Sequence, residues 1–251
     1  MPYLAYGICW RATSAPLPAE GELVVAEELA LVLGRRCPSG QPAVTEVLAF
    51  AQAVEALHRH GPLLPIRYGT VFGDAAQAEA FLRERAASLR AKLQAISDCD
   101  EATITFAQPT WEVPTATLPA TPTATAPATS PAAPPDALPA ASQLSGVAYL
   151  QQRRQLYEQK DRQQRWQAER LAEVQASLAG LFRDLAADEH RQPPPPRYAV
   201  QLLIARGAFP ALRDRFAASP LPHQQATLTG PYPCWHFGQL EPAPTTRSRT
   251  S

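Results

Sequence analysis

The chain has 251 residues, and its 23 Lys and Arg residues balance its 23 Asp and Glu residues, so its formal net charge at pH 7 is zero. A neutral chain lacks the basic excess that nucleic-acid and anionic-membrane binders use, and we therefore expect no nucleic acid and no membrane as partners. The apolar content of 45% supports packed cores, whereas 27 prolines predict a proline-rich segment outside them. The length allows two domains.

The cysteine pattern and the chain's start favour an intracellular protein. The four cysteines lie far apart and form no CxxC motif, and the opening MPYLAYGICWR lacks the basic and apolar regions of a secretory signal. No run approaches the roughly 18 apolar residues that a membrane-spanning helix needs. We therefore expect reduced thiols in the cytoplasm and a soluble chain.

The N-terminal part predicts strands followed by a helix. Residues 3–10, YLAYGICW, are typical of a buried strand. Residues 21–34, GELVVAEELALVLG, predict one or two more strands, with a helix as the alternative because Glu and Ala weaken the strand pattern. The following helix is expected to end at Gly61, before Pro62. Its apolar residues have helical spacing and predict a buried stripe of Val44, Val47, Leu48, Ala51, Val54 and Leu57.

Residues 64–72, LPIRYGTVF, predict a strand with one arginine among apolar and aromatic residues. Alternation along a strand places Arg67 on the same face as Gly69, where no side chain fills the space. We expect Arg67 to be a structural clamp that fixes the strand to the next helix or to a loop carboxylate. A role in contacting a partner is the alternative.

A helix and a strand complete the expected N-terminal domain. Asp74 and Gln77 have the spacing of a capping box, which predicts a helix start. The buried stripe of this helix is expected to be Phe81, Leu82, Leu89, Leu93 and Ile96. Residues 101–107, EATITFA, alternate polar and apolar and predict a half-buried strand. Residues 1–107 are therefore expected to form an α+β domain whose open sheet is covered on one face.

The composition changes after residue 107. Residues 108–142 are rich in Pro, Ala and Thr and nearly free of charge, and we interpret them as a linker. Residues 143–237 are expected to form a C-terminal α+β domain, and residues 238–251 a disordered tail. Each domain is predicted to be a small, mostly antiparallel sheet with helices packed on it in ferredoxin-like layers.

The C-terminal domain is expected to open with a long helix over residues 147–188. A seven-residue series with a second seam position runs through it: Leu150, Tyr157, Gln164, Leu171, Val174, Leu178, Leu181 and Leu185. An ordinary amphipathic helix on its own sheet is favoured over a partial coiled coil. RYAVQLLIA then predicts a strand, FPALRDRFAAS a short helix with Pro in its first turn, and QATLTGPYPCWHF a strand that enters an aromatic–proline corner.

The sequence contains no established catalytic motif. GxxxxGK[ST], GxGxxG, GxSxG and HExxH are all missing from it. His58 and His60 lie two apart on a helix and point to different faces, so a structural role is favoured over metal binding. Cys234 and His236 share a face of a strand, but catalysis would need an acidic partner and a lowered thiol pKa. We expect no catalytic residue, no cofactor and no metal.

Acidic and aromatic residues supply two further candidates. Asp98, Asp100 and Glu101 are expected to be solvated charges of a helix-to-strand loop, with an ion pair to Arg67 as an additional possibility. The aromatic residues Tyr232 and Trp235 lie between and beside prolines, and they form either a core plug or a binding edge.

Several segments resemble the gas vesicle protein F/L family (GvpF/GvpL). LPIRYGTVF at 64–72 resembles the signature LPxRFGTVF, and LTGPYPCWHF at 228–237 resembles the closing LTGPWPPYxF. GVAYLQQRR at 146–154 is similar to GxAYLxxRR, the N-terminal YLAYGICW resembles YVYGI, and residues 198–216 match a strand followed by a helix. Tyr232 stands where the family has Trp, and the Cys234–Trp235 pair replaces a Pro–Tyr pair.

The resemblance implies a non-enzymatic accessory or minor structural protein of gas vesicles, the buoyancy organelles of the cytoplasm. Its expected partners are the hydrophobic major shell protein (GvpA-like) and other accessory proteins, and its expected role is nucleation and assembly of the shell. A neutral surface favours a cyanobacterium or another bacterium as the source over a halophilic archaeon. The candidate structural or partner-contact residues are Arg67, Tyr68, Gly69, Gly230, Pro231, Tyr232 and Trp235.

The alternative belongs to a different class of function. A ligand-binding or enzymatic α+β protein would use a pocket between the two domains, with convergent polar groups and a perturbed titratable residue. Arg67, Cys234 and His236 are the residues available for such a pocket.

Overall fold

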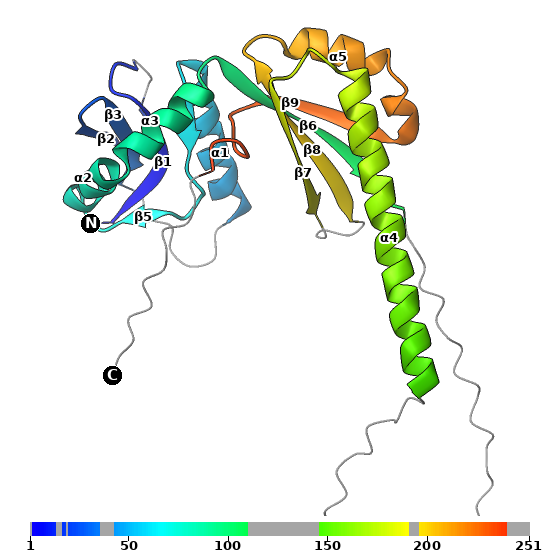
Figure 1. Cartoon of the computed structure of the whole chain (residues 1–251). Helices are drawn as coiled ribbons and strands as arrows, with labels where there is room; N and C mark the ends of the chain where they lie inside the picture. Colours follow the sequence, from blue (N-terminus) through cyan, green and yellow to red (C-terminus); the bar gives the residue numbers. More distant parts are fainter. Residues whose placement is uncertain are drawn as a thin grey trace, which may run out of the picture. The chain divides into compact units, whose positions relative to one another are not determined.

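The computed structural model describes residues 2–13, 17–18, 20–35, 43–109, 146–190 and 196–239, without the side chains of 146–149, 151, 152 and 190. The chain divides into a compact unit of Met1–Ala107 with Glu173–Ser251 and a second unit, Gln108–Ala172. Two antiparallel sheets with helices form the compact unit (Figure 1), which confirms the α+β class. The ferredoxin-like layering and the domain limits remain predictions, and nearly all of the expected linker lies outside the described residues.

The first sheet has the strand order β2-β3-β1-β4, with β5 paired to β1. Its strands are β1 (Tyr3–Trp10), β2 (Gly21–Ala26), β3 (Leu29–Gly34), β4 (Leu63–Pro65) and β5 (Val71–Phe72). The ambiguous segment 21–34 is therefore a hairpin, in which Ala26 pairs with Leu29. Its tight turn uses Glu27 with a φ of 55°.

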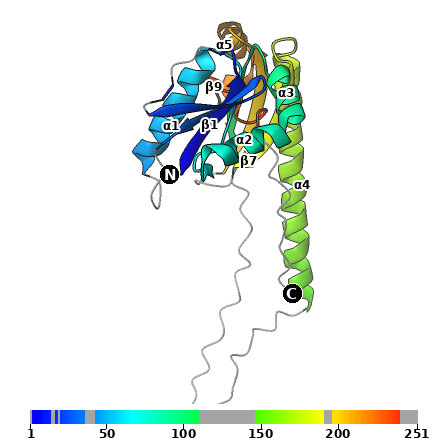
Figure 2. The same cartoon turned by 90° about the vertical axis from the view of Figure 1, so that its left-hand side faces the viewer.

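Helices cover both faces of this sheet rather than the single face expected (Figure 2). On one face, α1 (Val44–Arg59) packs Phe50, Val54 and Leu57 into a cluster with strand residues such as Val32. On the other, α2 (Ala75–Glu84) and α3 (Ala86–Ala95) contribute Leu82, Leu89 and Leu93 to the main core.

The buried stripe of α1 differs from the predicted one. Phe50, Val54, Leu57 and His58 are its buried residues. Val44 is 75% exposed and Leu48 56% exposed, although both have the helical spacing of core residues. Spacing alone defines a stripe but not its angular position, and the aromatic Phe50 sets which side of the helix faces the sheet.

The expected strand over 64–72 is two short strands joined by a turn, which corrects the prediction. Gly69 has a φ of 86°. The carbonyl oxygen of Arg67 accepts hydrogen bonds from the N–H (3.2 Å) and hydroxyl (2.8 Å) of Thr70. Both strands pair with β1, and this turn interrupts the pairing with β1 in the stretch that separates them.

The segment 74–96 begins as predicted but forms two helices. The Asp74 carboxylate accepts a hydrogen bond from the Gln77 N–H at 2.8 Å, and the Gln77 side chain accepts one from the Gly73 N–H at 2.6 Å. This arrangement confirms the helix cap. Arg85, with a φ of −111° and a ψ of 9°, separates α2 from α3. Leu82, Leu89, Leu93 and Ile96 are buried as expected.

The second sheet has the order β7-β8-β6-β9. It contains β6 (Cys99–Ala107), β7 (Asp184–His190), β8 (Arg197–Ala205) and β9 (Ala226–Tyr232). The strand β6 was expected to complete the N-terminal sheet, but it pairs with β8 and β9 instead. Its apolar alternate residues, Ala102, Ile104 and Phe106, are fully buried with those of β8.

The long helix is shorter than expected. The helix α4 spans Gly146–Ser177, and the predicted continuation to residue 188 is wrong, because a turn with Gly180 at a φ of 82° leads into strand β7. Leu185 therefore lies on a strand, outside any coiled-coil seam. The short helix α5 (Phe209–Ala217) has Pro in its first turn as predicted. None of the described helices is long and apolar enough to cross a membrane.

Candidate functional site

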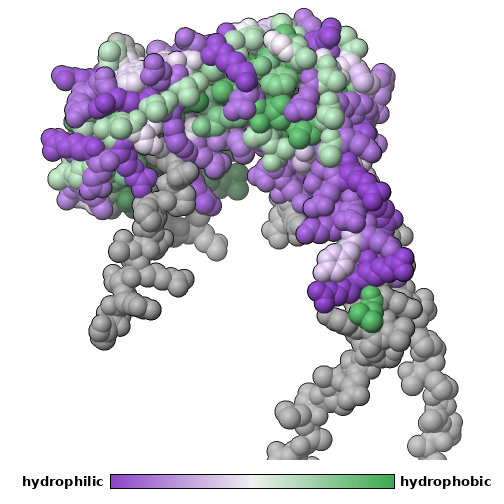
Figure 3. All heavy atoms as spheres, in the orientation of Figure 1, coloured by the Kyte–Doolittle hydropathy of each residue, from purple (hydrophilic) through white to green (hydrophobic). Residues whose placement is uncertain are grey.

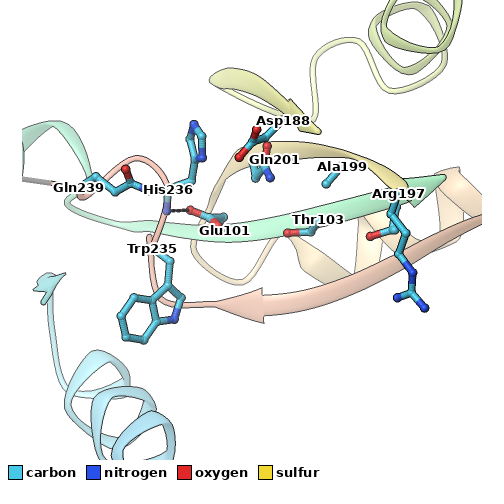
Figure 4. A pocket seen from close by; sticks show the side chains of 10 residues that line it. Glu101, Thr103, Asp188, Arg197, Ala199, Gln201, Trp235, His236 and Gln239 are labelled. Atoms are coloured by element: carbon cyan, nitrogen blue, oxygen red, sulfur yellow. Dashed lines mark hydrogen bonds between the residues drawn. The ribbon is translucent and has the colours of Figure 1, made fainter. Parts of the chain in front are cut away.

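Consecutive side chains of the closing segment 234–236 face three different environments. Cys234 is fully buried in the main core. Trp235 is half-buried against the cluster of α1, and His236 lines a groove on the second sheet. Figure 4 shows Trp235 and His236 pointing to opposite sides of the chain. The two motifs singled out in the sequence meet through this segment.

Phe50 of α1 joins those two motifs in an aromatic cluster. Its ring stacks on Tyr6 at 5.0 Å between centroids and meets Tyr68 edge-on at 5.1 Å. Trp235 lies 6.4 Å from it. The Tyr68 hydroxyl donates to the Glu46 carboxylate at 3.5 Å. The structure thus brings Tyr68 and Trp235 together, and Phe50, which sequence analysis did not single out, lies between them.

An exposed apolar stripe lies on α1, the helix that also carries Phe50. It consists of Val44 (75% exposed), Val47 (39%) and Leu48 (56%). Val47, three residues before Phe50, lies nearest to the side of Phe50, whereas Leu48, two residues before it, points to a different face of the helix. By contrast, Figure 3 shows hydrophilic residues over most of the visible surface of α4. We refer to Val44, Val47 and Leu48 as the α1 stripe.

The other predicted residues have separate positions. Arg67 is exposed and forms no side-chain ion pair with any described residue, so its carbonyl rather than its guanidinium fixes the turn with Gly69. Gly230 has a φ of 138°, and a Cβ there would lie 3.0 Å from Phe209 and 3.1 Å from the carbonyl oxygen of Glu101. Gly230 therefore allows β9 to approach β6 closely. Pro231 and Tyr232 follow it in β9, where Tyr232 pairs with Glu101.

Glu101 is a buried carboxyl group that sequence analysis treated as a solvated loop charge. Its side chain accepts a hydrogen bond from the His236 N–H at 2.8 Å, and the residue is 4% exposed. Burial raises the pKa of Glu101 to about 7, although the N–H groups of His236 and Phe237 act to lower it. The alternation of polar and apolar residues in 101–107 places Glu101 on the polar face of its strand, so the sequence gives no signal for this burial.

Glu101 lies at one end of a groove of about 410 Å³ on the open face of the second sheet (Figure 4). The floor comes from alternate residues of β6 and β8, and β7 adds Asp188. Strand register places Thr103 opposite Gln201 and Thr105 opposite Ala199. The lining residues are Glu101, Thr103, Thr105, Asp188, Arg197, Ala199, Gln201, Trp235, His236 and Gln239.

A second buried carboxyl, that of Asp100, links the end of α1 to the second sheet. It forms a 2.9 Å contact with the Nε2 of His58 and accepts a hydrogen bond from the Gly207 N–H at 3.3 Å. Burial would raise its pKa, but the bonds from His58 and Gly207 and the charge of Arg206 lower it. Arg206 also donates to the carbonyl of His58 at 3.0 Å. This clasp gives His58 a structural role and shows that Asp100 is not a solvated loop charge.

The described cysteines have the environment of core residues. Burial raises the pKa of Cys234, and the nearby Glu101 charge adds to the effect. Burial also raises the pKa of Cys9 to about 11, against a hydrogen bond with Thr13. The pKa of Cys99 is raised by burial and partly restored by Arg183. Raised values disfavour the thiolate, so these thiols are poor nucleophiles.

Comparison with known proteins gives one consistent result. The family model "Gas vesicle synthesis protein GvpL/GvpF" matches residues 3–239. The crystal structure of gas vesicle protein GvpF from Microcystis aeruginosa is similar with a TM-score of 0.64 and 15% identity, covering 95% of this chain and 99% of that one. The crystal structure of the gas vesicle protein GvpF from Anabaena sp. PCC7120 is similar with a TM-score of 0.61 and 11% identity, covering 96% of this chain and 97% of that one. No curated protein sequence matches the chain.

Proposed function

The chain belongs to the gas vesicle synthesis protein GvpL/GvpF family, and on that premise we propose that it is a non-enzymatic assembly factor of the gas vesicle shell. It binds the hydrophobic major shell protein (GvpA-like), limits its aggregation and helps nucleate the shell. The protein acts at the gas vesicle inside the cell, together with other accessory proteins. Buoyancy is then the outcome of the process it serves.

The observation that carries this proposal is the α1 stripe on the helix that also holds Phe50 of the aromatic cluster. Val44, Val47 and Leu48 form an exposed apolar row on a helix whose next turn holds Phe50. Exposed apolar residues that gather on one face of a helix are typical of surfaces that bind a hydrophobic partner. Tyr68 and Trp235 supply rings with polar tips at the edge of that surface, as binding residues often do.

The remaining predicted residues support this surface in different ways. Gly69 and Gly230 fix the turn and the close strand approach that position Tyr68 and Trp235. Arg67 is exposed beside Tyr68 and serves as a candidate contact to a polar group of the partner. Pro231 and Tyr232 form the end of β9, and the pairing of Tyr232 with Glu101 positions the closing segment that follows.

The test is co-expression of the chain with the major shell protein, followed by pull-down and measurement of soluble shell protein. A variant with Val44→Gln, Val47→Gln and Leu48→Gln should keep its fold, because these side chains are exposed, and should lose most of the recovered complex. A matched control carries Leu150→Gln and Leu156→Gln, two exposed leucines of α4. We expect the control to recover the complex like the unmodified chain.

Two results would contradict the proposal. If the unmodified chain recovers no shell protein and leaves its aggregation unchanged, the shell protein is not its partner. If the complex forms equally well with the α1 stripe variant, binding uses another surface.

A further inference from the structure

The groove on the second sheet has acceptor groups that lack a cationic partner. Glu101 is 4% exposed, and among the described residues its carboxylate has backbone N–H partners but no cationic one. Gln201 is 6% exposed, and its side-chain oxygen has no hydrogen-bond partner there. Buried charges in proteins are normally paired, and buried amide oxygens normally accept a bond. Both groups line the same hollow.

Strand register shows how these groups converge. Gln201 pairs with Thr103 on β6 and with Ala186 on β7, so Glu101 and Asp188 are its diagonal neighbours on the two adjacent strands. Each of these neighbours is about 7–8 Å from Gln201, and they lie on opposite sides of it, so Gln201 stands between the two carboxyl groups. The small side chain of Ala199, between Thr105 and Asp188, leaves the space open.

Around Gln201 the groove offers mainly hydrogen-bond acceptors and few donors. In Figure 4, Glu101, Asp188 and Gln201 gather at one end of the groove, and the guanidinium of Arg197 points away from them at the other end. The hydroxyl of Thr103 can donate or accept. A ligand that pairs with the buried carboxylate of Glu101 and satisfies the amide oxygen of Gln201 brings several N–H donors and a positive charge. A guanidinium has five donors in a fixed plane.

We propose that this groove binds an arginine side chain of a partner polypeptide, whose guanidinium pairs with Glu101 and donates to the oxygen of Gln201, while Asp188 on the other side of Gln201 adds negative charge. The site is separate from the α1 stripe and does not depend on the shell protein as partner. It would add a polar, orientation-setting contact to an assembly whose other contacts are apolar.

The test is an NMR titration of the ¹⁵N-labelled full chain with the capped tripeptide Gly-Arg-Gly, at a pH above the titration of Glu101. Gly-citrulline-Gly is the matched probe, because citrulline has nearly the same shape without the charge. We expect saturable shifts of the Gln201 side-chain amide and the His236 N–H with the arginine probe alone. Loss of a charge-assisted pair in the Glu101→Gln, Asp188→Asn double variant should weaken binding about tenfold or more.

The controls separate this site from other sources of binding. Asp214→Asn removes an exposed carboxylate of α5 and should leave the affinity unchanged. Equal shifts with the citrulline probe, or unchanged affinity in the double variant, would overturn the proposal. Residues 247 and 249 are also arginines. If only the Arg247→Gln, Arg249→Gln variant binds the probe, the chain's own arginines occupy the groove and the assignment to a partner is wrong.

Discussion

Replacing Glu101 with Gln should remove a large pH dependence from the stability of the fold. Burial raises the pKa of Glu101 from 4.5 to about 7, so the folded chain holds this proton more tightly than the unfolded chain does. The extra stability is fully present below the unfolded value and is lost as the pH rises through the folded value. At about 1.36 kcal/mol per unit, the loss between about pH 5 and pH 8 is about 2.5 kcal/mol.

Urea unfolding followed by tryptophan fluorescence measures this loss. The free energy of unfolding of the unmodified chain and of the Glu101→Gln variant is measured at about pH 5 and about pH 8, and the fall between these pH values should be larger in the unmodified chain by the loss worked out above. Gln resembles the protonated carboxyl in shape and keeps an acceptor for the His236 N–H, so the variant should fold. Asp188→Asn, an exposed change in the same groove, is the control and should keep the pH dependence.

One result would refute the reasoning: equal losses of stability in the unmodified chain and the Glu101→Gln variant. The titration of Asp100 does not contribute to the change in stability between about pH 5 and about pH 8. Its pKa is lowered from 3.8, so its contribution is present above that value and is lost only as the pH falls below it.

Three other substitutions test the packing behind the two surfaces by the same unfolding assay. Phe50→Ala should cost about 3–5 kcal/mol, because a 4% exposed ring at the centre of the aromatic cluster is lost, whereas Val44→Ala at an exposed site should stay within about 0.5 kcal/mol. Gly230→Ala should destabilise far more than Gly69→Ala, because both have a positive φ but only Gly230 lacks room for a Cβ. Asp74→Ala should cost about 1 kcal/mol through loss of the α2 cap, and unchanged stability would contradict that role.

Sequence analysis predicted most elements correctly where one period dominated. The strands β1 and β8, the helix α1 and the cap at Asp74 all have a single clear pattern. The prediction failed where the local sequence is compatible with both a helix and a strand and where pairing with a distant strand decides between them. Residues 184–190 continue a helical spacing from α4, yet they form β7, because β8 offers a partner for the whole segment. Pairing over such distances cannot be derived from local spacing.

Sequence analysis found only part of the candidate site, because the rest of the site also depends on long-range pairing. Motif resemblance identified Tyr68 and Trp235, and the structure places both on the ring of Phe50. The buried state of Glu101 and Asp100 was missed, since an acidic run after a helix is usually solvated. Their burial follows from β6 lying in the middle of the second sheet, between β8 and β9. That position is a property of the sheet order, which the sequence does not display.

The closing segment 234–236 contacts both the aromatic cluster of α1 and the groove on the second sheet. Trp235 packs toward Phe50, while the N–H of the next residue, His236, holds Glu101 at the end of the groove. A partner that pulls Trp235 out of the aromatic cluster must move the adjacent peptide group and so weaken that hydrogen bond. A bond to a charged group is worth about 1.5–3 kcal/mol, and its loss leaves a buried carboxylate less satisfied. Binding at the α1 stripe and binding in the groove should therefore be coupled whenever the partner displaces Trp235.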